Sequence, residues 1–331
     1  MGSIGNKDMN ILITGAAGFI GQALAAALIE ESPSARLTLT DVTEPAIPFR
    51  EGTEGVDDNI RSLAADLTSK DVCNELFTQD LTHVYLLHGI MSGAAEANYD
   101  LGFRVNVDSM RFVADALRRH SKKEAQKVIF PSSLAVFGPS GPDNVVTEDT
   151  MPQPRSSYGT EKAMAELLFN DLSRRGLIDA RIVRLPTIIV RPGKPTGAAS
   201  SFCSGIIREP LNGEMSELPV PKTLRLWVSS TRTVIRNLVQ AKDIPASKFG
   251  DGTRIVNLPG ISVSVQEMLQ ALVEVSGEKA GRLVQEKPDA NVEKIVASWP
   301  ADFDVSKAKA LGFHDDVPLT QAVRDYICDY K

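Results

Sequence analysis

Residues 9–31 read MNILITGAAGFIGQALAAALIEE, and this stretch determines the class of fold. MNILIT (9–14) is a short apolar run rich in β-branched residues, which predicts a buried strand. The glycine turn after it leads into alanine- and leucine-rich sequence that predicts a helix from about Gly18, ending before SPSA (32–35). RLTLTDV (36–42) then alternates like a second strand. The order strand, glycine turn, helix, strand predicts the first half of a parallel βαβ unit.

The three glycines of this turn, Gly15, Gly18 and Gly21, predict a dinucleotide site. Without side chains they let backbone N–H groups and the helix N-terminus approach a pyrophosphate. Asp41 ends the next strand, 20 residues after Gly21, at the spacing of a carboxylate that binds the adenosine ribose. Tight helix packing alone would also explain the glycines, but not the acid. Because Asp41 would repel a 2′-phosphate, it favours NAD over NADP, a rule that a nearby arginine can overturn.

The alternation of strands and helices continues along the chain. Strands are predicted at IRSLAADL (60–67), THVYLLHG (82–89) and KVIFPSS (127–133), and helices at 69–79, 99–120 and 157–175. Repeated βα units predict an α/β fold, a doubly wound parallel sheet of the Rossmann type. Ligands of such sheets bind beyond the carboxyl ends of the strands, where Gly15, Asp41, His88 and Ser133 fall.

Tyr158 and Lys162 stand four residues apart and share one face of the helix predicted over 157–175. A phenol with a pKa near 10 is a poor base at neutral pH, but a neighbouring ammonium and a cationic nicotinamide ring favour its phenolate form. Ser132 and Ser133 end a predicted strand at the same edge of the sheet, and Ser133 precedes Tyr158 by 25 residues. An exposed tyrosine and lysine on an ordinary helix is the alternative interpretation.

Taken together, these motifs resemble the extended short-chain dehydrogenase/reductases, also called the NAD-dependent epimerase/dehydratase family. The resemblance covers the N-terminal half, in TGAAGFIG (14–21), Asp41, ADL (65–67), LLHG (86–89), RVNVD (104–108), PSSLAVFG (131–138) and YGTEK (158–162). It implies catalytic roles for Ser133, Tyr158 and Lys162, with Ser132 as the alternative serine. Phe137 departs from the family, which often has tyrosine there.

The resemblance also implies a set of residues that contact NAD. These are Gly15, Gly18, Phe19, Ile20, Gly21, Asp41, Asp66, Leu67, Leu87, His88, Gly89, Asn106, Tyr158, Lys162, Leu185 and Thr187. Leu185, Pro186 and Thr187, at the end of the strand predicted over ARIVRLPTI (180–188), match the family position that faces the nicotinamide carboxamide.

The C-terminal half bears on the substrate. From Arg181 to Arg236, nine lysines and arginines stand against three acids, which suggests an anionic small molecule or else a solvated basic face. The segments 88–108, 184–213 and 225–230 resemble the D-erythronate dehydrogenase group of the family, which oxidises the 2-hydroxyl of a small sugar acid. The substrate candidates are Ser92, Ser133, Tyr158, Arg191, Ser200 and Arg225. Arg225 stands where nucleotide-sugar relatives bind the diphosphate.

Three other functions compete with an NAD-dependent dehydrogenase of a small sugar acid or 2-hydroxy acid. A nucleotide-sugar 4-epimerase would retain its cofactor and show no net NADH production. A ketoreductase of another small carbonyl compound is the second, because relatives diverge mainly in the substrate lobe. A binding or regulatory protein on a dinucleotide scaffold is the third, since a fold alone does not assign function. Such proteins commonly lose the tyrosine or the lysine, and both are present here.

The composition of the chain limits the classes of molecule that we expect it to bind. A net charge of -6 argues against nucleic acid and anionic membranes. No signal peptide or membrane span is apparent, so we expect a cytoplasmic protein. Three cysteines that lie far apart suggest no disulfide framework, and four histidines without the spacing of metal ligands suggest no metal site.

We expect a Rossmann domain over 1–186, to which the chain returns near 226–260, and a smaller substrate-binding lobe made of 187–225 and 261–331. The resemblance further implies a homodimer through a four-helix bundle. Its seam would involve Met110, Val113, Leu117, Met164, Leu167 and Leu168, although burial in the monomer explains these apolar residues equally well.

Overall fold

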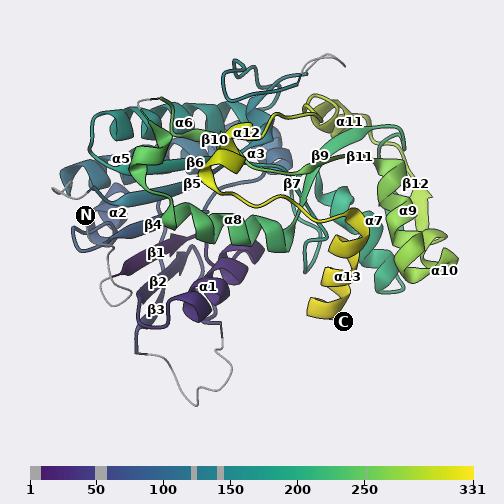
Figure 1. Ribbon diagram of the computed structural model, residues 1–331, viewed down its shortest axis with the longest axis horizontal. Coiled ribbons are helices and arrows are strands. Elements are labelled where there is room, and N and C mark those ends of the chain that lie inside the picture. Colours follow the sequence, from purple (N-terminus) through teal and green to yellow (C-terminus); the bar gives the residue numbers. More distant parts are fainter. Residues whose placement is uncertain (1–8, 49–57, 121–124, 140–144, 251) are drawn as a thin grey trace.

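The computed structural model describes residues 9–48, 58–120, 125–139, 145–250 and 252–331 (Figure 1). Its main element is a seven-stranded sheet in which every paired strand is parallel. In spatial order the strands are β10 (Ile255–Asn257), β6 (Asp179–Leu185), β5 (Lys127–Ser133), β4 (His83–Leu86), β1 (Asn10–Thr14), β2 (Arg36–Asp41) and β3 (Ile60–Ala64). The predicted doubly wound α/β fold is confirmed.

Helices cover both faces of this sheet (Figure 1). One face packs against α1 (Phe19–Glu31), α8 (Thr231–Asp243) and α12 (Ser306–Leu311). The other packs against α2 (Lys70–Leu76), α5 (Ser109–Arg119) and α6 (Ser157–Arg174). The helix predicted over 99–120 consists of α4 (Tyr99–Phe103), the π-helical turn η2 (Arg104–Asp108) and α5, and α3 (Ser92–Ala97) precedes it. Short 3₁₀ turns, η3 (Leu134–Val136) and η4 (Ala246–Phe249), follow β5 and α8.

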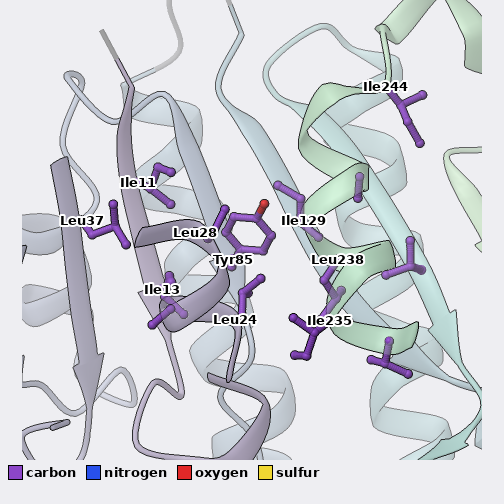
Figure 2. Packing of buried hydrophobic residues seen from close by; sticks show 14 of the residues in the cluster. Ile11, Ile13, Leu24, Leu28, Leu37, Tyr85, Ile129, Ile235, Leu238 and Ile244 are labelled. Atoms are coloured by element: carbon purple, nitrogen blue, oxygen red, sulfur yellow. The ribbon is translucent and has the colours of Figure 1, made fainter. Parts of the chain in front are cut away.

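The alternation of side chains along β1 explains why its sequence is apolar throughout. Ile11 and Ile13 belong to the core beneath α1 and α8, where Leu24 and Leu238 join them (Figure 2). Leu12, between them, belongs to the core on the opposite face. Because helices bury both faces of a parallel sheet, a central strand needs apolar residues at every position.

A second, smaller part of the chain has a core of its own. A three-stranded sheet has the order β11 (Ile261–Ser264), β9 (Arg225–Ser230), β7 (Thr187–Ile189), and β8 (Ser216–Leu218) pairs with β12 (Val284–Glu286). The helices here are α7 (Ser201–Leu211), α9 (Val265–Ser276), α10 (Glu278–Gly281), α11 (Ala290–Val296) and α13 (Leu319–Tyr330). None of the helices formed by the described residues combines the length and apolar character that crossing a membrane requires.

The prediction of one strand over 180–188 is wrong. β6 ends at Leu185 in the main sheet, and β7 begins at Thr187 in the three-stranded sheet. Pro186 lies between them, and a proline offers no N–H to a ladder, so the chain changes sheets at this residue. The segment near 226–260, which was predicted to return to the Rossmann domain, is also divided between the two sheets. Strand β9 lies in the three-stranded sheet, whereas α8 and β10 pack with the main sheet.

The C-terminal segment joins both parts of the molecule. Leu311 and Phe313, expected in the smaller lobe, are buried in the same core as α1 and α8. Phe303 lies with its ring centroid 5.2 Å from that of Trp227 and 5.7 Å from that of Phe137. The domain boundaries drawn from the sequence remain a prediction, but residues 303–313 do not stay within the smaller lobe.

Half of the apolar seam proposed for a dimer is occupied within the monomer. Met110, Val113 and Leu117 of α5 are at most 1% exposed and pack between α5 and the sheet. They are therefore unable to contact a second copy. Met164 and Leu167 of α6 are exposed instead.

Candidate active site

A cavity of about 430 Å³ opens beyond the carboxyl ends of β1, β4, β5 and β6. Most residues predicted to contact cofactor or substrate line it together. They are Gly15, Gly18, Phe19, Ile20, Gly21, Asp41, Leu87, His88, Gly89, Ser92, Ser133, Tyr158, Lys162, Leu185, Thr187, Arg191 and Ser200. Ser132 lines it as well. The parallel sheet brings these residues together because all its strands end at one edge.

The glycine turn forms a cradle that fits a dinucleotide. Gly15 has φ +68°, and a side chain there would meet the backbone of Leu87 and His88 at about 2.5 Å. A side chain at Gly18 would lie 3.3 Å from Gly15 O, and Gly18 caps α1 without a side-chain hydrogen bond. No side-chain acceptor therefore caps the first turn of α1, and its N–H groups and helix dipole are available to a pyrophosphate.

Asp41 is fixed at the rim of this cradle by the backbone. Its two carboxylate oxygens accept hydrogen bonds from Ala17 N at 3.1 Å and Val42 N at 2.7 Å. The carboxylate thus lies beside the glycine turn, where a ribose hydroxyl of a bound dinucleotide would find an acceptor.

An adjoining cavity of about 520 Å³ contains two further cofactor candidates, Asp66 and Leu67, and shares Gly15, Asp41 and His88 with the first. Asn106 lines neither cavity and is only 2% exposed. Its amide accepts from Ile90 N at 2.8 Å and donates to Ile90 O at 3.0 Å. The structure therefore places Asn106 outside both cavities, where its amide holds the loop after β4, and its contact with the cofactor stays a prediction.

Tyr158, Lys162 and Ser133 meet at the centre of the cavity wall. Tyr158 forms a hydrogen bond with Ser133. The Lys162 ammonium lies 5.7 Å from the centroid of the Tyr158 ring and donates to Pro131 O at 3.0 Å. Ser156 caps α6 by accepting from Gly159 N at 3.2 Å, which places both functional side chains in the first two turns of the helix.

Burial opposes the charged forms of both groups. It raises the pKa of Tyr158 to about 12, against the hydrogen bond from Ser133 and the positive charge of Arg191, which lower it. Burial also lowers the pKa of Lys162 to about 8, against the carboxylates of Glu166 and Glu161, which raise it. Each group would therefore respond strongly to a charge placed beside it.

His88 forms part of the wall through two hydroxyl groups. Its Nδ1 lies 2.7 Å from Thr14 Oγ1, and its Nε2 lies 3.0 Å from Ser109 Oγ. Burial and the nearby Lys162 ammonium lower its pKa to about 3, so the ring is neutral at physiological pH. The charges that act on the pKa of Tyr158 are those of Arg191, which lowers it, and Glu161, which raises it.

Arg191 is the positive charge on the other side of the cavity. The residue is 7% exposed, and its guanidinium donates to Ile188 O at 2.9 Å and to Ser200 Oγ at 2.8 Å. No carboxylate of the described residues forms an ion pair with it. Val190, immediately before it, has φ 49°, a backbone conformation that is strained for a β-branched residue. The guanidinium charge of Arg191 is therefore buried without a carboxylate partner among the described residues, an arrangement that is costly unless a negative charge approaches it.

The remaining substrate candidates differ in placement. Ser92 lines the cavity and accepts from Ala199 N at 3.0 Å, which ties the loop 191–200 to α3. Arg225 does not reach the cavity: its guanidinium lies in an exposed position, donating to Ser262 O at 3.0 Å and pairing with Glu267 at 3.5 Å. The structure therefore places Arg225 outside the cavity that Tyr158 and Lys162 line, and its role toward the substrate stays a prediction.

Trp299 is a cavity residue that sequence reasoning missed. It follows α11, about a hundred residues after the other lining residues, and its indole Nε1 has no hydrogen-bond partner. No local pattern marks it, since only the return of the C-terminal segment brings it to this cavity. Within the described residues, no group of three or more histidines, cysteines or acids is arranged to hold a metal ion.

The model of the "NAD dependent epimerase/dehydratase family" matches residues 11–246, which include the cradle, Tyr158 and Lys162. The chain belongs to this family. It is an enzyme of the family and uses NAD, and its glycine cradle and Asp41 fit that cofactor.

Two proteins called D-erythronate dehydrogenase are among the relatives of this family member. The protein from Cupriavidus necator is 42% identical, over 97% of this chain and 98% of its own. The protein from Haemophilus influenzae is 40% identical, over 96% and 99%. A solved structure described as a nucleoside-diphosphate-sugar epimerase from Agrobacterium tumefaciens is 36% identical and has a TM-score of 0.89, covering 97% of this chain and 94% of its own.

Proposed function

We propose that this enzyme is an NAD-dependent dehydrogenase that oxidises a secondary hydroxyl of a small sugar acid or 2-hydroxy acid, with D-erythronate as the model substrate. The observation that carries the proposal is the buried, acid-free guanidinium of Arg191 in the same cavity as Tyr158. A guanidinium binds a carboxylate through two parallel hydrogen bonds, which would orient a small acid. The names of the two relatives support the same substrate class.

In the proposed mechanism, the phenolate of Tyr158 takes the proton of the substrate hydroxyl. Ser133, which shares a hydrogen bond with Tyr158, orients the oxygen undergoing change. The Lys162 ammonium stabilises the phenolate and holds the nicotinamide ribose. Bound NAD supplies the hydride acceptor of the reaction. Reduction reverses these steps.

The placement of Arg225 favours a small acid over a nucleotide sugar. On the family resemblance this arginine would bind the diphosphate, but here it is engaged with Ser262 and Glu267 outside the cavity. Arg191 and Ser200 are left as the anion-binding side chains that line the cavity.

The test is NADH absorbance at 340 nm with purified protein, NAD and a panel of small sugar acids and 2-hydroxy acids, repeated with NADP. We expect turnover of D-erythronate or a close relative, with NAD preferred because of Asp41. Tyr158→Phe should lower turnover by at least about 10²-fold while leaving NAD binding nearly intact. Full activity of Tyr158→Phe would eliminate the mechanism. Tightly retained NAD with no turnover of the panel would instead support an epimerase.

We also propose a homodimer, formed through the outer face of α6 in a cytoplasmic enzyme of carbohydrate metabolism. Leu167 is 70% exposed and Met164, three residues before it on α6, is 41% exposed; Tyr99 of α4, a helix that packs against α6, is 61% exposed. Exposed large apolar side chains grouped in this way are typical of a protein interface. Leu167→Glu should therefore lower the mass observed by light scattering from two chains to one. An unchanged mass would remove α6 from the interface.

A further inference from the structure

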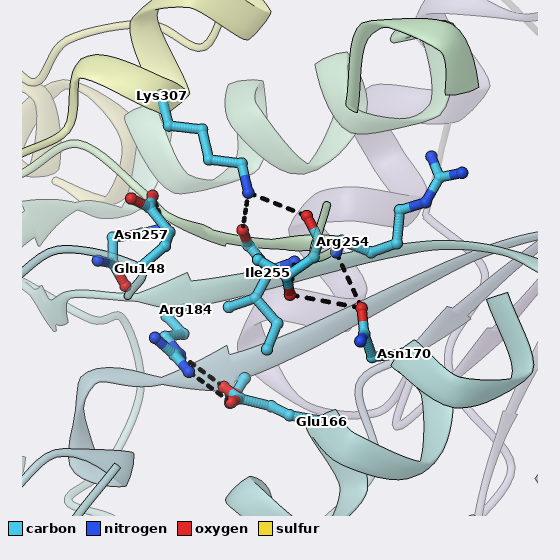
Figure 3. Close-up of polar contacts among 10 residues, drawn as sticks. Glu148, Glu166, Asn170, Arg184, Arg254, Ile255, Asn257 and Lys307 are labelled. Carbon is cyan, nitrogen blue, oxygen red and sulfur yellow. Dashed lines mark hydrogen bonds and ion pairs between the residues drawn. The ribbon is translucent and has the colours of Figure 1, made fainter. Parts of the chain in front are cut away.

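A buried ion pair joins α6 to β6, the strand next to the one that ends on Ser133 (Figure 3). Arg184 donates from Nε and Nη2 to the two carboxylate oxygens of Glu166, at 2.8 and 2.7 Å. Arg184 is 3% exposed and Glu166 is 1% exposed. A bidentate pair of this kind holds both partners in one orientation.

This ion pair is connected to the catalytic edge of the sheet at two points. Ser132, which precedes Ser133 and lines the cavity, donates from Oγ to Glu166 Oε1 at 2.6 Å. Glu166 also follows Lys162 by four residues on α6, so their side chains lie on the same helix face. The Glu166 carboxylate therefore connects the end of β5 to the helix face that carries Lys162.

We propose that Glu166, held in place by Arg184, is a positioning residue for the reaction: it keeps the Lys162 ammonium charged beside Tyr158 and orients the end of β5 that carries Ser133. The inference rests on the Ser-Tyr-Lys chemistry proposed above. It assigns to a residue outside the cavity a role that acts entirely through Lys162 and Ser132.

Stability alone does not explain this pair. Removing two charges from water costs several kcal/mol per ion, and apolar replacements of buried ion pairs are often neutral or stabilising. The pair is also incompletely satisfied, since Arg184 Nη1 has no hydrogen-bond partner and its guanidinium lies 4.6 Å from the centroid of the Phe137 ring. A role beyond packing accounts for keeping charged residues here.

Several elements contribute charged or titratable groups around the lysine and the phenol. They are Glu161 and Glu166 on α6, Glu96 on α3, His88 after β4, Arg184 on β6 and Arg191 after β7. Burial lowers the pKa of Lys162, and among these groups Glu166 acts most strongly to raise it again. His88 is neutral and Arg191 is positive, so neither replaces the negative charge of Glu166.

The test is the pH dependence of kcat/KM for oxidation by the whole enzyme, with Glu166→Gln combined with Arg184→Gln. The double variant leaves no unpaired buried ion, whereas Glu166→Gln alone would strand Arg184 and endanger folding. A weaker ammonium makes the phenolate harder to form, so the rise of kcat/KM should move to higher pH. We expect a shift of about one unit, which lowers kcat/KM about 10-fold at any pH below the midpoint.

A matched control is Asp179→Asn combined with Arg181→Gln, which removes a buried ion pair from the other end of β6. It should lower the Tm without moving the pH profile. A folded Glu166/Arg184 double variant with the profile of the unmodified enzyme would overturn the positioning role, while an inactive Tyr158→Phe would still support the proposed function. Full activity of Tyr158→Phe would instead remove the proposed function itself.

Discussion

At the scale of single residues, two arginines that the sequence offers equally as partners for an anionic substrate differ in their exposure to solvent. Arg191 is buried in the cavity, and Arg225 is exposed beyond it. Arg191→Met should lower kcat/KM for a sugar acid by about 10²-fold, mainly through KM, because a buried charge-assisted pair is lost. Arg225→Met is the matched control and should leave KM within about twofold. Steady-state kinetics on D-erythronate measures both, and equal effects would remove Arg191 from the anion site.

At the scale of elements, the close approach of α6 to the turn after β5 sets the distance between Tyr158 and Ser133. A side chain at Gly159 would clash with the carbonyl oxygen of Ala135, which belongs to η3. Gly159→Ala should therefore push α6 away from the turn after β5. We expect kcat to fall by at least about 10-fold, and the free energy of unfolding to fall by less than the activation free energy rises. Comparing kcat with the Tm separates the two effects. A variant with normal kcat would show that the helix tolerates the shift.

At the scale of the whole molecule, buried neutral histidines make the fold sensitive to acid. Burial, together with Lys127, Lys242 and Arg181, lowers the pKa of His83 to about 3, and burial lowers that of His88 to about 3. An unfolded histidine has a pKa near 6.5, so between about pH 6.5 and 3 the unfolded chain binds more protons. The free energy of unfolding should therefore fall with falling pH in this window, by up to about 1.4 kcal/mol per pH unit per histidine.

Urea unfolding at several pH values measures this slope. His83→Gln should reduce it by about the contribution of one histidine, even if the variant is less stable at neutral pH. His120→Gln is the matched control, because this half-buried histidine is the C-cap of α5 and lies apart from His83 and His88. An equal slope in all three proteins would show that other groups cause the acid sensitivity.

The sequence by itself determined the parallel sheet, the glycine cradle and the edge of the sheet at which the candidate residues meet. These depend on local patterns: periodicity assigns each strand and helix, and parallel strands bring residues that follow them, such as Asp41, Ser133 and Tyr158, to one edge. The cofactor followed from the same patterns and from the family that they resemble, and the family match confirms it.

Only the tertiary structure decided which polar residues face the cavity. Arg191 and Arg225 both come from the basic stretch 181–236, but the change of sheet at Pro186 and the start of β9 place one inside the cavity and the other outside it. Asn106 turned out to support a loop, and Trp299 reached the cavity from the C-terminal segment. The bond from Arg184 to Glu166 also depends on packing between distant elements. Such contacts join residues that are far apart in the sequence, and whether a side chain is buried depends on how the helices and strands pack against one another.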